Sequence, residues 1–168
     1  LWLTFGLSIF WTLPFPSWEQ LISVVSAGLV LSYAIAPVTA AGLRRNAPDL
    51  PRPFRVRAFG IIGPVSFMIS ALIVYWSGWN TLSWLLGLQI VMFVVYVMCK
   101  GKVPEHTVSL AQQVKASLWL IVFYALIILF SWLGSFGGLN VIGHPWDTVL
   151  VAAMSLGIYY WGARSCLP

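Results

Sequence analysis

The chain has 168 residues, of which 60% are hydrophobic, 15% aromatic and only 8% charged. Its mean hydropathy is +0.91, and its charged fraction is far below the roughly 25% of soluble domains. So few charges cannot cover a water-exposed surface, which excludes a soluble globular protein, and the apolar excess excludes a disordered or collagen-like chain. Lysine and arginine outnumber acidic residues nine to four. In a membrane chain they mark cytoplasmic loops, so we expect a lipid bilayer as partner and no nucleic acid.

The start of the chain and its two cysteines indicate neither a targeting segment nor a disulfide or metal site. The chain begins at Leu1 inside an apolar run, with no basic segment and no small-residue cleavage site. We therefore expect no signal peptide and interpret the chain as part of a longer protein. Cys99 and Cys166 have neither disulfide nor metal-ligand spacing, and we interpret them as incidental thiols.

Long apolar runs dominate the sequence. About 20 apolar residues cross the roughly 30 Å of a bilayer core, and continuous runs do not fit the alternating pattern of a membrane barrel. The fold class is therefore all-α, a polytopic transmembrane helix bundle. Its six spans, the first truncated, are predicted at residues 1–13, 21–43, 60–76, 82–99, 117–133 and 148–163. Turns are predicted at residues 77–81 and at residues 134–146.

The distribution of charge predicts the orientation. With six spans, every basic residue falls on one side of the membrane, while Glu19 and Asp147 lie on the other. The positive-inside rule makes the basic side cytoplasmic. We therefore predict a multi-pass protein of the cell inner membrane, with a cytoplasmic loop at residues 100–116 and a cytoplasmic C-terminus.

Few residues inside the spans are polar, and no ionisable side chain lies in them, so we expect no proton relay or ion site there. Small residues recur every fourth position in the second span and predict a helix-packing ridge: Gly28, Ser32, Ala36 and Ala40. Tyr33 and Pro37 on the same helix are candidates for a gate, because Pro37 frees a backbone carbonyl near Tyr33. Gln89 in the fourth span is expected to form a hydrogen bond to a neighbouring helix.

Catalytic patterns are missing. His106 and His144 lie in predicted loops without partners at metal or hydrolase spacing, and the chain has no phosphate loop, nucleophile elbow or Cys-x-x-Cys. We expect no enzyme, no metal and no cofactor.

The predicted cytoplasmic loop at residues 44–57 is basic and rich in proline, and it follows the second predicted span. Five arginines lie in it: Arg44, Arg45, Arg52, Arg55 and Arg57. The prolines prevent a continuous helix. We interpret the segment as an anchor that fixes topology and holds anionic lipid head groups, in preference to a substrate site.

Two stretches, residues 32–38 (SYAIAPV) and 43–56 (LRRNAPDLPRPFRV), resemble the end of the tenth helix and the next cytoplasmic loop of bacterial amino acid permeases of the amino acid–polyamine–organocation (APC) family. Residues 63–67 (GPVSF) through 75–79 (YWSGW) are similar to its aspartate–proton symporter branch. The resemblance implies a LeuT-like fold of two inverted five-helix repeats plus two helices. Residues 1–99 would then be its last four helices, and residues 117–168 two additional helices and a short tail.

The resemblance also implies a function. The chain would be the C-terminal part of a secondary transporter that imports an amino acid with protons, and its partners would be upstream helices, the amino acid and the proton. The family's substrate site would lie upstream of Leu1, so no substrate-binding residue is carried over, and the peripheral helices would pack against lipid or a second copy. Two alternatives remain open: a non-transport scaffold or accessory module, and a membrane-embedded transferase.

Overall fold

The computed structural model describes residues 1–12, 17–49, 51, 56–99 and 110–166, and these residues form six α-helices and no strand. The helices are α1 (Trp2–Thr12), α2 (Trp18–Asn46), α3 (Phe59–Trp76), α4 (Gly78–Cys99), α5 (Leu110–Leu133) and α6 (Trp146–Ser165). The predicted all-α class is confirmed. By length and composition, α2, α3, α4 and α5 can each cross a membrane. The helix α6 is 20 residues long but less apolar, because Asp147 and Arg164 lie in its first and last turns.

Polar residues at both ends make α2 longer than the predicted span. Ser17 caps its start, accepting a hydrogen bond from the Gln20 backbone N–H at 3.3 Å. Arg44 and Arg45 occupy its last turn, where positive charge meets the negative end of the helix dipole. The apolar run therefore marks the part of the helix that crosses lipid, and the helix itself extends into the polar flanks.

The predicted turn at residues 77–81 is tighter than expected. The helix α3 ends at Trp76 and α4 begins at Gly78, which has a φ of +84°. Only glycine adopts this backbone conformation without strain, so the chain turns sharply from α3 into α4 through Ser77 alone. The Trp79 backbone N–H then donates to the Phe136 carbonyl at 2.9 Å, which joins the start of α4 to the α5–α6 connection.

A second boundary also differs. The helix α5 begins at Leu110, so residues 110–116, predicted as part of the cytoplasmic loop, are helical. This stretch contains alanine, glutamine and lysine, all of which favour helix, although its glutamines and lysine are too polar for a membrane span.

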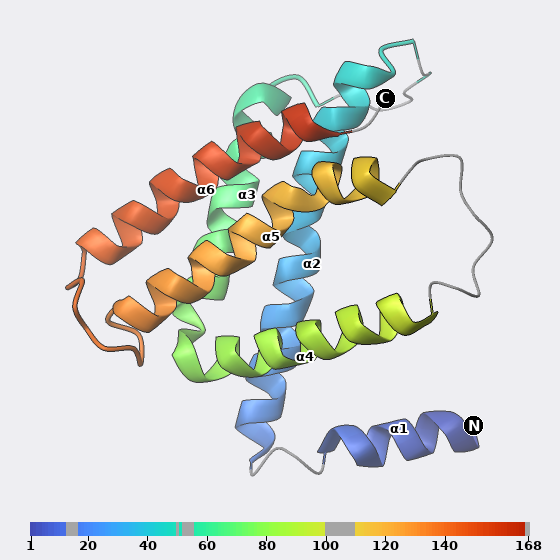
Figure 1. Ribbon diagram of the computed structural model, residues 1–168. Coiled ribbons are helices and arrows are strands. Elements are labelled where there is room, and N and C mark those ends of the chain that lie inside the picture. The colour runs from blue at the N-terminus through green and yellow to red at the C-terminus, as the bar shows by residue number, and fades with distance from the viewer. Residues whose placement is uncertain (13–16, 50, 52–55, 100–109, 167–168) are drawn as a thin grey trace.

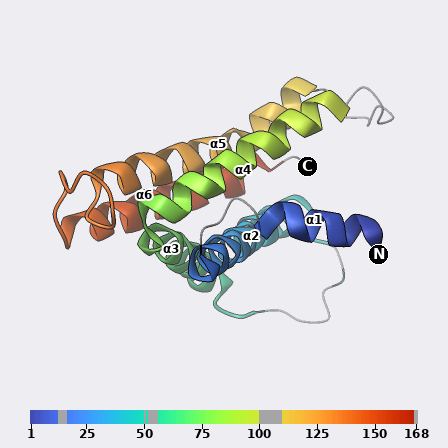
Figure 2. The ribbon, with the colours of Figure 1, turned by 90° about the horizontal axis from the view of Figure 1, so that it is seen from below.

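Two layers make up the bundle. Helices α4, α5 and α6 lie side by side in one layer, and α2 and α3 cross them in the other (Figures 1 and 2). Aromatic rings fill the space between the layers: the Phe67 centroid lies 5.0 Å from Phe123, 6.0 Å from Tyr159 and 6.5 Å from Trp119. Burying such rings stabilises the contact between α3, α5 and α6.

Small residues let these helices approach closely. A Cβ atom on Gly162 of α6 would lie 2.8 Å from the Trp119 ring and 2.9 Å from Val38. Close contact through small residues is the usual way in which helices associate in lipid. Gly162 thus permits α2, α5 and α6 to meet.

Candidate functional site

A buried carboxylate lies at the end of the bundle where α3 and α5 end and α6 begins. Asp147, in the first turn of α6, has no exposed surface. An ionised group in such a place is costly unless other groups hydrogen-bond to it. Its surroundings are therefore the first place to look for a functional arrangement.

Three parts of the chain supply hydrogen bonds to Asp147. Its Oδ2 accepts from the Tyr75 hydroxyl of α3 at 2.8 Å, and from both the hydroxyl and the backbone N–H of Ser135. Its Oδ1 accepts from the backbone N–H and hydroxyl of Thr148, at 2.6 and 3.2 Å. The Nδ1 atom of His144 lies 3.6 Å from Oδ1, and the His144 side chain is 64% exposed. We call these five residues the Asp147 network.

Donors surround both carboxylate oxygens, an arrangement that stabilises the ionised form. The position at the start of α6 adds the favourable field of the helix dipole. Because Tyr75 belongs to α3 and Ser135 to the α5–α6 connection, the network ties these segments to α6. Among the described residues its hydrogen bonds serve a structural role, because they hold α3, the α5–α6 connection and α6 together.

Sequence reasoning missed this network. Asp147 precedes the predicted sixth span by one residue, and the sequence predicts only that it lies on the outer side of the membrane. His144 is a solvent-exposed loop residue, as expected, but it lies beside Asp147. The one local signal is an aspartate in the first turn of an apolar helix; the partnership with Tyr75, 72 positions away, is a tertiary contact.

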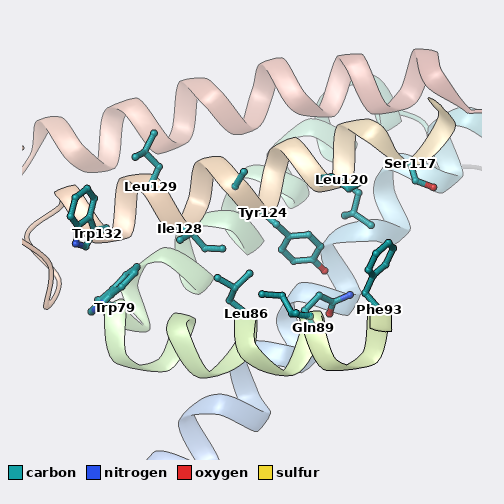
Figure 3. A pocket seen from close by; sticks show the side chains of 13 residues that line it. Trp79, Leu86, Gln89, Phe93, Ser117, Leu120, Tyr124, Ile128, Leu129 and Trp132 are labelled. Carbon is teal, nitrogen blue, oxygen red and sulfur yellow. The ribbon is translucent and has the colours of Figure 1, made fainter. Parts of the chain in front are cut away.

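A groove of about 830 Å³ runs between α4 and α5 (Figure 3). Trp79 and Trp132 lie at one end, and Phe93 and Ser117 at the other. The remaining lining residues are mostly aliphatic: Leu86, Gln89, Ile90, Leu120, Ile121, Tyr124, Ala125, Ile128 and Leu129. Such a surface suits an apolar neighbour and provides no charge to bind an ion.

Gln89 faces this groove together with Tyr124 (Figure 3). The residues that the structure describes give its side chain no hydrogen bond, so the expected bond to a neighbouring helix is not formed within this part of the chain. The reason is geometric: the Gln89 side chain is exposed on the open side of α4.

The predicted ridge on α2 is only partly covered by the described helices. Ser32 and Ala36 are exposed, and a Cβ on Gly28 would meet only Leu85, at 3.9 Å. Packing within the chain uses a different face of α2, formed by Val24, Ala27, Leu31, Ala34, Val38 and Gly42. Ala40 is half-buried. The ridge stays a prediction for contacts with helices outside this chain.

The two gate candidates lie on α2, and within the described part of the chain the Tyr33 hydroxyl forms no hydrogen bond. Tyr33 is 66% exposed, and Pro37 lies half-buried in α2, which continues past it to Asn46. Both residues stay predictions.

The basic segment is partly described. The Arg44 guanidinium lies 4.0 Å from the centre of the Phe59 ring and donates to the Val56 carbonyl at 3.5 Å. Arg45 and Arg57 are exposed, whereas Arg52 and Arg55 lie outside the described residues. The C-terminal end of α6 meets this segment, because the Asn46 amide donates to the Cys166 carbonyl at 3.1 Å.

Neither thiol chemistry nor metal binding is indicated in the described part of the chain. Burial raises the pKa of the Cys166 thiol, which keeps it protonated and poorly nucleophilic. The described residues contain no group of three or more His, Cys, Asp or Glu that could hold a metal ion.

Comparison with known proteins gives two relatives. The chain is 57% identical over 169 aligned residues to the aspartate-proton symporter of Bacillus subtilis (strain 168), which covers 100% of the chain and 32% of that protein. It is 33% identical over 153 residues to the glutamate/serine transporter AimA of the same organism, covering 90% of the chain and 28% of that protein. The chain therefore spans about a third of the length of the curated relatives it matches.

Two further comparisons found nothing. No family model matches the chain, and no solved structure matches it. The two relatives and the apolar helices nevertheless identify a multi-pass membrane protein in contact with lipid.

Proposed function

We propose that the chain is the C-terminal part of a secondary active amino acid transporter of the APC family, one that imports aspartate together with protons. The observation that carries the proposal is the 57% identity with the aspartate-proton symporter, which extends over the whole chain. Two proteins that share this much sequence over this length are expected to share a fold. The second relative is also named as an amino acid transporter. Residues 1–99 would be the last four helices of the permease, and residues 117–168 would add two.

The two faces of α2 support a place at the edge of a larger bundle. One face is buried against this chain's own helices, whereas the opposite face exposes Ile22, Val25, Leu29, Ser32, Tyr33 and Ala36. An apolar helix with small residues on its free face packs well against other helices in a membrane. In the proposal, the upstream helices of the transporter cover this face, and Tyr33 and Pro37 lie next to the moving bundle.

The orientation follows from the positive charges. All nine lysines and arginines fall on one side if the helices alternate across the membrane. We place that side, and the C-terminus, in the cytoplasm and the protein in the inner membrane.

The substrate site lies outside this chain in the proposal. Aspartate carries an amino group and two carboxylates, which require charged or polar partners in a membrane. The groove between α4 and α5 is lined mainly by apolar side chains, and Asp147 is already fully hydrogen-bonded. This part of the protein therefore acts as scaffold.

Uptake by the purified full-length protein in liposomes tests the proposal. With an acidic exterior, we expect accumulation of labelled aspartate above its external concentration, and abolition of accumulation by a protonophore. Liposomes without protein are the control. Absence of gradient-dependent uptake of aspartate, glutamate or serine would refute transport, and uptake that ignores the protonophore would refute proton coupling.

A further inference from the structure

Four arginines gather at the end of the bundle opposite the Asp147 network. Arg44 and Arg45 lie in the last turn of α2, Arg57 in the turn before α3, and Arg164 in the last turn of α6. We call these residues the arginine cluster.

Contacts between three chain segments create the cluster. Arg44 reaches the Val56 carbonyl and the Phe59 ring, which joins the end of α2 to the start of α3. Asn46 donates to the Cys166 carbonyl, which joins the end of α2 to the end of α6. Figure 1 shows these three helix ends together at the top of the bundle.

The positive charge of the cluster is not neutralised within the described residues. None of its arginines forms an ion pair with a described carboxylate; the one ion pair described is His144–Asp147, at the other end. The ends of α2 and α6 supply about half a negative charge each, and the start of α3 about half a positive charge; Asp49 supplies one negative charge more. About two and a half positive charges remain for an external anion.

The geometry favours a phosphate group. Arg44 is half-buried and held by the Phe59 ring, whereas Arg45, Arg57 and Arg164 are exposed. A guanidinium presents a planar set of donors that binds phosphate oxygens in pairs, and an Arg already held in place loses less conformational entropy on binding.

The cluster also lies where lipid head groups are. It occupies the ends of α2 and α3, both able to cross the membrane, and Trp161 in the last turns of α6 is 39% exposed beside it. Tryptophan at a helix end is typical of the membrane–water interface.

We propose that the arginine cluster binds the phosphate of an anionic phospholipid, with Arg44 as the pre-oriented member and Arg45, Arg57 and Arg164 completing the site. The site belongs to the membrane scaffold and stands whether or not the protein transports aspartate.

The test measures lipid retained by the purified full-length protein, using native mass spectrometry with phosphatidylglycerol and with zwitterionic phosphatidylcholine. We expect phosphatidylglycerol adducts to dominate. Each basic residue near an anionic lipid surface strengthens binding to it about fivefold. The variant R45Q/R57Q/R164Q should therefore bind phosphatidylglycerol on the order of 100-fold more weakly, while its binding of phosphatidylcholine stays unchanged.

A charge-matched control separates a site from general attraction. K100Q/K102Q/K115Q removes the same number of positive charges outside the cluster and should weaken phosphatidylglycerol binding much less than R45Q/R57Q/R164Q does. Equal losses in both triple variants would overturn the proposal, and so would displacement of the lipid by millimolar inorganic phosphate. R57Q alone changes an exposed turn residue and should weaken binding about fivefold; no change there, in a protein that elutes as the parent does, would also contradict the site.

Discussion

The two ends of this bundle differ in whether their charged side chains are buried and hydrogen-bonded or exposed. At one end, Asp147 is buried and receives hydrogen bonds from Tyr75, Ser135 and Thr148. At the other end, exposed arginines remain without carboxylate partners among the described residues. Buried charge must be satisfied inside the protein, so it stabilises one arrangement of helices. Exposed charge at a membrane surface is instead free to interact with what lies outside.

Among the variants that test this comparison, D147N is expected to lower the free energy of unfolding most. An asparagine keeps the shape but loses the charge, and its amide N–H₂ group would face donors. Removing one side of a buried charged network costs about 3–5 kcal/mol. Equilibrium unfolding of the purified protein in mixed micelles measures the loss.

The matched control is D49N, which changes an exposed acid beside the arginine cluster. Its unfolding free energy should change by about 0.5 kcal/mol or less. Similar losses from D147N and D49N would mean that burial of Asp147 has no energetic consequence.

A smaller effect is expected from Y75F, which removes one donor to the carboxylate. A hydrogen bond to a charged group contributes about 1.5–3 kcal/mol. Y159F supplies the comparison, because Tyr159 is also buried but does not contact Asp147. The same unfolding measurement should show the larger loss for Y75F, and additive losses in Y75F/D147N would argue that the two residues act independently.

Glycine variants test the helix packing at the other end of the bundle, near the arginine cluster. G162A would push a methyl group against Trp119 and Val38, and overpacking costs about 1–3 kcal/mol. G157A on the same helix has open space around it and should be neutral or stabilising by up to about 1 kcal/mol. Unfolding free energies that do not differ between these variants would contradict the packing described.

The positions of the helices could be predicted because long apolar runs report directly on lipid crossing. Their exact limits could not: α2 and α5 extend into polar flanks, and the turn before α4 depends on the backbone freedom of Gly78. The Asp147 network could not be predicted from the sequence, for a different reason. Hydropathy shows that a residue is charged, but burial comes from the tertiary meeting of α3 with α6.

The arrangement of the arginines could be predicted only in part, and their role as an anchor stays a prediction. Their number and their position at the end of an apolar run predict an anchor, whereas their convergence with Arg164 depends on the contact between Asn46 and Cys166, 120 positions apart. The ridge on α2 was predicted from spacing, but spacing does not say which neighbour will cover it.

Chemical labelling of single cysteines tests the central claim, that the two ends lie on opposite faces of the membrane. Gly143 and Ala58 are both exposed, and a Cβ on Gly143 would meet nothing within 4 Å. In a cysteine-free background and intact cells, G143C should react with an impermeant maleimide, and A58C should react only after permeabilisation. Labelling of both positions from outside would place the Asp147 network and the arginine cluster on the same face and contradict the account.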